Sequence, residues 1–195
     1  MRLLISTRIV LGTLLLAGIG HAHAQAAHGQ SGDLAVTFIG QRSLNADTGQ
    51  SFWMEGGSGE LGFNLIHGLG LAADYTATHT NSIGSDGIPL TLSVIAFGPR
   101  YRWHANHRLS VYGEPLFGYA SGSDSAFPAA TGSVSTASSF ALQLNGGIDY
   151  RLSRHFAVRP LDFGYLRTAL PNGNDNAQNT LRLGGGLVFH FGIHL

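Results

Sequence analysis

The tetrapeptide HANH places two potential metal ligands, His104 and His107, in one short turn. Two imidazoles alone rarely hold a metal ion, and no acidic residue lies beside them in the sequence. The chain also has no cysteine, so thiolate ligands and disulfides are excluded. We therefore expect a polar turn at this position and no metal site.

A glycine-rich stretch, GSGELG at residues 57–62, matches the pattern of a dinucleotide-binding loop. That pattern requires a following helix to bind the pyrophosphate, whereas this stretch lies inside an alternating segment. We expect its glycines to leave room for large neighbouring side chains. His190, with Gly186 and Gly192 on the same face, is expected to be a hydrogen-bonded interior residue and not a base. The sequence thus predicts no cofactor and no catalytic residue.

The N-terminus has the features of a secretory signal. Arg2 and Arg8 supply a basic region, and residues 9–19 are apolar but too short to cross a bilayer as a helix. The tripeptide AHA at 22–24 fits a cleavage site. The expected divisions are a signal peptide at 1–24, a short segment at 25–32 and one folded domain at 33–195.

Most of the remaining chain alternates between apolar residues and small or polar ones, which is the two-residue period of β-strands. In the last segment, for example, Leu183, Leu187 and Phe189 alternate with Arg182 and with glycines. The eight segments with this period are 33–41, 52–66, 68–79, 91–103, 109–120, 139–152, 156–168 and 181–195.

The connections between these segments alternate in length. Those near 67, at 104–108 and at 153–155 are short. The others, at 42–51, 80–90, 121–138 and 169–180, are long and rich in residues that form turns and loops. Short turns at one end and long loops at the other are typical of an up-and-down antiparallel meander. Eight strands let it close without an exposed edge, so we predict an all-β, eight-stranded antiparallel barrel.

One face of the predicted barrel is apolar, and the other combines small residues with charges. Small residues gain nothing on an open surface, but inside a narrow tube they leave space for guanidinium groups. Arginine supplies every basic residue, and eleven basic residues match eleven acidic ones; the formal charge of zero argues against a nucleic-acid partner. The predicted interior charges are Glu60, Asp74, Arg100, Arg102, Glu114, Asp149, Arg151, Arg159, Asp162 and Arg182.

Aromatic residues on the apolar face lie near strand ends, as in the two girdles of a transmembrane barrel. We therefore expect the apolar face to meet lipid, although a soluble secreted barrel with that face inside is an alternative. The aromatics toward the long loops are Trp53, Tyr75, Phe117, Tyr119, Phe140 and Tyr165, and those toward the short turns are Tyr101, Trp103, Tyr150, Phe156 and Phe191.

Residues from about 33 to 195 resemble the small eight-stranded outer-membrane barrel family typified by outer membrane protein A. The resemblance rests on FGPRYRW, SRHFAVRPLDFGYLRT and PNGNDNAQNTLRLGGGLVFHFG. It implies outer-membrane localisation, surrounding lipid, and periplasmic chaperones and the barrel-assembly machinery as partners during assembly. Gly186, Phe189 and Phe191 are similar to the terminal assembly signal of that class. No peptidoglycan-binding domain is expected.

These features predict a monomeric, non-catalytic barrel with a structural or surface-interaction role through its four long loops, whose partner the sequence does not name. One alternative is a lipid A-modifying deacylase or acyltransferase, which needs a nucleophile and a base at the membrane surface. Ser51, His79 and Ser139 lie near strand ends, but no spacing joins a serine, a histidine and an acid, and there is no G-x-S-x-G element. The other alternative is a narrow gated pore.

The turn at 153–155 allows a register to be counted for the two strands that it joins. This count places Asp149 opposite Arg159 on the inward face. Pro160 cannot donate a ladder hydrogen bond, so we predict a bulge at 160–161 that brings both Arg159 and Asp162 inward.

Counts across the other short turns make further predictions. A count across HANHR that pairs Trp103 with Leu109 places Arg100 diagonal to Glu114. Pairing Leu65 with Leu69 places Glu60 opposite Asp74, a like-charge pair that needs an arginine from elsewhere. A second bulge is expected at Gly146-Gly147, where the two faces of the sixth strand exchange parity.

Overall fold

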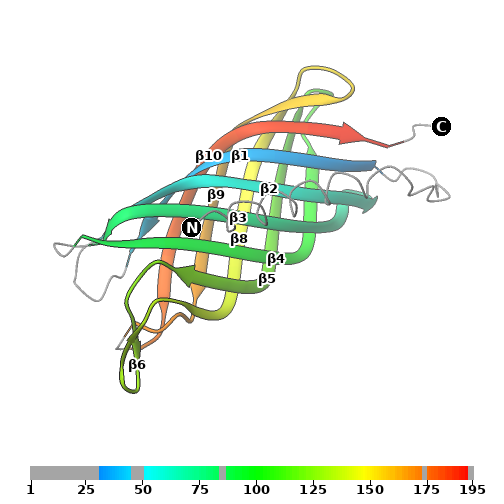
Figure 1. Ribbon diagram of the computed structural model, residues 1–195. Helices are drawn as coiled ribbons and strands as arrows, with labels where there is room; N and C mark the ends of the chain where they lie inside the picture. Colours follow the sequence, from blue (N-terminus) through cyan, green and yellow to red (C-terminus); the bar gives the residue numbers. More distant parts are fainter. Residues whose placement is uncertain (1–30, 45–50, 84–86, 173–174, 193–195) are drawn as a thin grey trace, which may run out of the picture.

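The computed structural model describes residues 31–44, 51–83, 87–172 and 175–192 (Figure 1). Eight long strands close into one antiparallel barrel in which β1 pairs with both β2 and β10, so the predicted fold class is confirmed. The barrel strands are β1 Ser31–Ser43, β2 Trp53–Ile66, β3 Leu69–Ile83, β4 Ile88–His104, β5 Leu109–Ser123, β8 Ala137–Arg151, β9 Phe156–Thr168 and β10 Gln178–Phe191.

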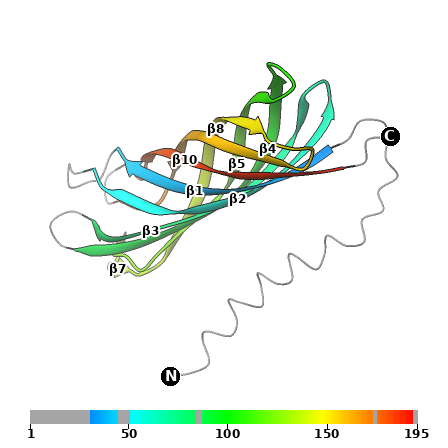
Figure 2. The same ribbon diagram turned by 90° about the horizontal axis from the view of Figure 1, so that it is seen from above.

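The connections give the barrel two different ends. We call the end reached by the segments between β1 and β2, β3 and β4, β5 and β8, and β9 and β10 the long-loop end, and the other the short-turn end (Figure 1). The segment after β5 contains a hairpin that the sequence did not predict, formed by β6 Phe127–Ala129 and β7 Gly132–Val134. Figure 2 shows this hairpin beside the other long connections.

The strand period puts the apolar side chains on the outside of the barrel. Val36, Phe38 and Leu187 are each more than 60% exposed, whereas their chain neighbours Thr37 and Val188 are buried. This arrangement contradicts a soluble barrel with an apolar filling and agrees with the predicted lipid-facing surface. Within the described residues no helix has the length and apolar character needed to cross a membrane.

The observed bounds differ from the predicted ones mainly at strand ends. β1 begins at Ser31, two residues before the predicted domain start, and β10 begins at Gln178 and ends at Phe191. The predicted signal peptide at 1–24 lies outside the described residues, as do positions 193–195.

The short turn between β2 and β3 depends on glycine. His67 and Gly68 both have positive φ, and the backbone nitrogen of Arg102 donates to the oxygen of Gly68 over 2.7 Å. A Cβ at Gly68 would lie 2.3 Å from the carbonyl oxygen of Arg102. Any larger residue would therefore push β4 away from this turn.

One predicted bulge is present and the other is absent. On β9 the register shifts between Arg159 and Asp162, so Gly185 of β10 faces two residues, and Arg159 and Asp162 both point inward. The prediction at Gly146-Gly147 was wrong, because β8 pairs with β5 without interruption from Tyr150 to Ala137. Inward residues of β8 keep odd numbers throughout, so no parity change exists to require a bulge.

The predicted registers hold in two of three places. Glu60 pairs directly with Asp74 as counted, and Asp149 contacts Arg159. The count across HANHR was wrong by two residues, since Trp103 pairs with Val111 and not with Leu109. The turn is longer than assumed, because the backbone nitrogens of Ala105 and Asn106 both donate to Leu109.

Candidate functional site

Charged side chains fill the barrel from its middle toward the short-turn end. Four arginines and six carboxylates point inward, and none is more than 3% exposed. Each arginine contacts at least two carboxylates, as a low-dielectric interior requires if the charges are to persist. The members of this interior charge network are Asp33, Glu60, Asp74, Arg100, Arg102, Glu114, Asp149, Arg159, Asp162 and Arg182.

Arg100 joins three strands through three carboxylates. Its Nε donates to Glu114 Oε2 over 2.8 Å and its Nη1 to Asp33 Oδ1 over 2.8 Å, while Nη2 donates to Glu60. The two-residue register difference between β4 and β5 puts Arg100 level with Glu114 instead of diagonal to it. Gly62 makes the contact with Asp33 possible, because a Cβ there would lie 1.9 Å from Arg100 Nη1. The glycine-rich stretch at 57–62 therefore lies within a strand and accommodates a guanidinium, as expected.

Arg159, like Arg100, contacts three carboxylates. Its Nε lies 2.8 Å from Asp149 Oδ1, the predicted pair, and its Nη1 lies 3.2 Å from both Glu60 Oε1 and Asp162 Oδ2. The Tyr112 ring lies 4.2 Å from the guanidinium carbon, and the Tyr112 hydroxyl donates to Asp162 over 2.7 Å. Alternation alone places Tyr112 on the inward face, but its position beside this arginine depends on barrel closure.

Arg182 compensates Asp74, one of the two like charges in the Glu60–Asp74 pair between β2 and β3. It donates to Asp74 Oδ1 over 3.2 Å and to Asp162 Oδ1 over 3.0 Å. Glu60, the other half, is held by Arg100 and Arg159. The pair is therefore neutralised by arginines from β4, β9 and β10, which no count across a single hairpin could identify.

Two residues differ from the predicted set of interior charges. Arg151 is exposed, because it is the last residue of β8 and its inward face opens to solvent at the short-turn end. Asp33 was missed, although it is fully buried and contacts Arg100 and Arg102. The sequence could have indicated this, because Asp33 precedes the outward Leu34 and neighbouring residues of a strand point to opposite faces.

Apolar side chains gather in the interior toward the long-loop end, beside buried polar residues such as Gln41, Thr78 and Gln143. The sequence did not predict this cluster. Met54, Leu90, Leu92 and Leu116 are all buried there. Phe127 of the β6–β7 hairpin packs onto this cluster, against Gly122, whose added Cβ would lie 2.4 Å from the Phe127 ring. We call it the apolar layer. Its members are Met54, Ala72, Leu90, Leu92, Val94, Ala96, Leu116, Ala120, Phe127, Ala141, Leu166 and Leu170.

The predicted serines do not meet a histidine. Ser51 Oγ accepts from Arg42 Nη2 over 3.0 Å. Ser139 Oγ donates to the oxygen of Phe140 and accepts from the nitrogen of Ala169. These contacts hold local backbone and side chains and do not form an activated nucleophile.

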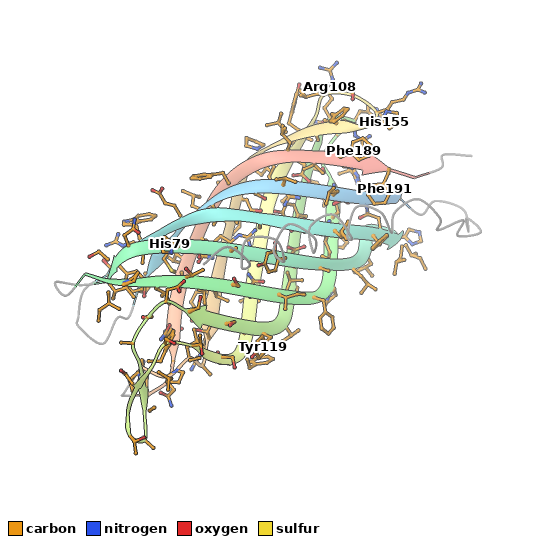
Figure 3. All side chains as sticks on the ribbon, in the orientation of Figure 1. His79, Arg108, Tyr119, His155, Phe189 and Phe191 are labelled. Carbon is orange, nitrogen blue, oxygen red and sulfur yellow. The ribbon has the colours of Figure 1, made fainter. Side chains whose placement is uncertain are left out.

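His79 instead joins a chain of polar groups on the outer surface near the long-loop end (Figure 3). Its Nδ1 lies 2.9 Å from Thr91 Oγ1, which lies 2.9 Å from Asp124 Oδ2, and its Nε2 lies 3.0 Å from Asn81 Oδ1. Thr91 Oγ1 donates to the Asp124 carboxylate, which can only accept, so the hydroxyl proton is not directed at His79 Nδ1. This polarity anchors the imidazole and does not draw the proton from Thr91 for nucleophilic attack.

An open depression of about 1360 Å³ lies at the short-turn end. Basic residues dominate its wall, and His190, which is half-buried, lines it from β10. His104 and His107 belong to the same wall without an acid beside them, and no group of metal-ligating side chains occurs among the described residues. The basic and histidine side chains of this wall are His104, His107, Arg108, Arg151, Arg154, His155 and His190.

The last strand carries the residues compared with an assembly signal. Gly186 lies against β1, where a Cβ would come 2.0 Å from the oxygen of Val36. Phe189 and Phe191 lie near the short-turn end (Figure 3), with ring centroids 5.3 Å from Phe156 and 6.5 Å from Phe63 respectively.

Comparison with known proteins identifies the class of this barrel. A family model described as the outer membrane protein beta-barrel domain matches residues 12–191. Neisserial surface protein A is 16% identical with a TM-score of 0.67, over 84% of this chain and 100% of that one. Ail of Yersinia pestis, crystallised with the heparin analogue sucrose octasulfate, is 19% identical with a TM-score of 0.56, over 85% and 100%.

A third solved structure has the same architecture. OprG from Pseudomonas aeruginosa is 10% identical with a TM-score of 0.51, over 87% of this chain and 99% of that one. At these identities the likenesses to solved structures show a common fold. No curated protein sequence matches the chain.

Proposed function

Because this chain belongs to the outer membrane protein β-barrel domain family and is therefore an outer-membrane protein, we propose that it acts without catalysis. Its role is structural, or it recognises a surface partner through the loops at the long-loop end. The observation that carries this proposal is the filled interior. The charge network occupies the middle of the barrel, and the apolar layer occupies the long-loop end above it.

The filled interior argues against the gated-pore alternative. A conducting path would have to separate several ion pairs at once, since Glu60, Asp149 and Asp162 share Arg159. It would also have to displace the buried side chains of the apolar layer, together with Gln41 and Gln143, which are buried beside them. An eight-stranded barrel has an interior that side chains can fill, which agrees with a closed structure.

The loops supply the surface that the proposal requires. The β6–β7 hairpin is held by buried Phe127, while Val134 and the tip residues 130–133 are exposed. An ordered, anchored hairpin loses little conformational freedom when it binds a partner. This hairpin is therefore the best-prepared contact region among the described loops.

Charge bears on the class of loop partner. Ail was solved with a heparin analogue, which is a polyanion. Here the long-loop end exposes Arg42 and Arg167 beside Glu55, Asp124 and Asp175, and the sequence adds Asp47 and Asp86 to the same connecting segments. The excess of acids disfavours a polyanion, so we infer a partner recognised by hydrogen bonds and by apolar contact with the hairpin.

The route to the membrane follows from the same family. We infer export with cleavage after Ala24, escort by periplasmic chaperones, and insertion by the barrel-assembly machinery reading Gly186, Phe189 and Phe191. The closed sheet leaves no strand edge for self-association, which supports a monomer. N-terminal sequencing of the membrane form should begin at Gln25 or, as a second choice, at Ala27, and recovery of Met1 would refute cleavage.

The test of the proposed function compares cells with and without the protein. Lipid A analysed by mass spectrometry should be identical in both, whereas envelope integrity or attachment to a surface should differ. A variant with residues 128–133 replaced by a short Gly-Ser turn should lose attachment but keep the folded barrel. A loss or gain of an acyl chain on lipid A would establish the enzyme alternative instead.

A further inference from the structure

The exposed charges of the barrel are divided between its ends. Three arginines, Arg108, Arg151 and Arg154, are exposed at the short-turn end. The acidic side chains near that end, Asp33 and Asp149, are buried in the charge network. Among the described residues, this end therefore exposes positive charge without an exposed acid, whereas acids are in excess at the long-loop end.

The backbones of two of these arginines are hydrogen-bonded to each other. The backbone nitrogen of Arg151 donates to the oxygen of Arg108 over 2.7 Å, so the turn after β4 and the end of β8 are joined at these residues. Neither guanidinium has a carboxylate partner among the ion pairs of the described residues. An anion at this end would therefore meet arginines whose positive charge is not offset by a carboxylate among the described residues.

The position of the pair relative to the outer surface indicates where the anion comes from. Arg108 Nη1 lies 3.5 Å from the hydroxyl of Tyr150, an outward aromatic of the short-turn girdle. Trp103 and Phe156 are exposed at the same end. Such aromatics lie at headgroup level in a membrane, so Arg108 lies at the depth of lipid phosphates. Figure 3 shows Arg108 and His155 at this end of the barrel.

The loop that carries Arg154 is also ordered. Ser153 Oγ accepts hydrogen bonds from the backbone nitrogens of His155 and Phe156, and the His155 ring stacks on Phe189 with centroids 6.3 Å apart. Arg154 is therefore presented from a defined turn beside the Arg108–Arg151 pair.

We propose that the short-turn end binds the phosphate of an anionic glycerophospholipid, with Arg108 and Arg151 as the primary contacts and Arg154 as a further contact. This inference rests on the membrane location of the barrel and is independent of the proposed loop function. It gives the barrel a fixed lipid contact in the periplasmic leaflet, which the acidic long-loop end lacks.

The two tryptophans allow each end to be examined separately, because Trp103 is at the short-turn end and Trp53 at the long-loop end. The experiment uses Trp53→Phe protein, so that Trp103 is the only tryptophan, in phosphatidylcholine vesicles with a minor fraction of phosphatidylglycerol. Quenching of the tryptophan fluorescence is measured once with brominated phosphatidylcholine and once with brominated phosphatidylglycerol. The reciprocal Trp103→Phe protein reports the long-loop end.

We expect quenching of Trp103 to show local enrichment of phosphatidylglycerol of about fivefold, the size expected for one arginine at an anionic surface. Arg108→Gln with Arg151→Gln should return quenching to the bulk lipid ratio, while Arg167→Gln, at the other end, should leave the enrichment unchanged. Trp53 should report no enrichment. A bulk ratio at Trp103 in the otherwise unchanged protein would overturn the proposal.

A second experiment distinguishes a lipid phosphate from a soluble phosphate ester as the bound group. Glycerol 1-phosphate added to pure phosphatidylcholine vesicles should leave the Trp103 spectrum unchanged and should not displace phosphatidylglycerol at equal concentration. Displacement at equal concentration would show a site for soluble phosphate esters and would contradict a lipid contact. Equal enrichment in the double arginine variant would also contradict it, because the preference would then not depend on these residues.

Discussion

Arg159 of β9 and Asp149 of β8 lie opposite each other on neighbouring strands inside the barrel, with Nε 2.8 Å from Oδ1 and both side chains buried. The same guanidinium also contacts Glu60 and Asp162. This arginine therefore connects β2, β8 and β9 through the interior as well as through the sheet.

Breaking this pair should be costly. Arg159→Ala and Asp149→Ala should each lower the free energy of unfolding, by roughly 3–5 kcal/mol where water cannot reach the remaining charge. Arg159→Ala should cost more, because it leaves three carboxylates without that partner. The double variant should cost less than the sum in urea titrations of the membrane-inserted barrel, and additive losses would show that the two residues do not interact.

The glycines of β2 offer a matched test of interior space. Gly62→Ala should destabilise the barrel by roughly 1–3 kcal/mol, because its Cβ would displace Arg100 from Asp33. Gly59→Ala, three residues earlier on the outward face, meets nothing within 4 Å and should be close to neutral. Thermal unfolding of both variants measures the difference, and equal midpoints would place Arg100 elsewhere.

The outward face can be tested by inserting charge. Leu187, which is 62% exposed on β10, should resist replacement by arginine at a cost of about 2–4 kcal/mol if it lies near the bilayer midplane. Ser133→Arg in the β6–β7 hairpin should be nearly neutral. The folding yield into vesicles and the stability in urea are measured for both variants. If Leu187→Arg were tolerated as well as Ser133→Arg, the lipid-facing surface would be wrongly assigned.

Removal of Phe127 should release the β6–β7 hairpin without opening the barrel. Phe127→Ala takes a buried ring from the apolar layer, so cleavage within residues 124–136 by added protease should become faster. Val134→Ala, at an exposed position, should not change the cleavage rate. A hairpin equally resistant in both variants would show that Phe127 does not anchor it.

Alternation in the sequence was enough to predict the barrel, its outward apolar face and nine of the ten proposed interior charges. This prediction succeeds because the strands have a two-residue period, interrupted on β9 by the predicted bulge, and one face must meet lipid. It failed for Arg151 because parity gives the direction of a side chain but not its depth along the barrel. Asp33 was overlooked for a related reason, since attention to the apolar face of β1 left its other face unexamined.

The apolar layer and the partners of Arg182 required the closed structure. Met54, Leu92 and Leu166 come from β2, β4 and β9, so no single strand shows that their side chains form one cluster. Arg182 and Asp74 are 108 residues apart in the chain, and only closure of the barrel brings their strands to the same interior level.

The charge network and the apolar layer fill the interior of the barrel, and electrical recording across a planar lipid bilayer measures whether they close it. Purified, folded protein should give no stepwise conductance above that of the bare bilayer, both at rest and under applied voltage, because the charge network and the apolar layer would both have to open. A protein carrying Leu92→Ser and Leu116→Ser in the apolar layer together with Arg100→Ala in the network should begin to conduct. Stable single-channel steps from the unaltered protein would contradict the account and establish a pore.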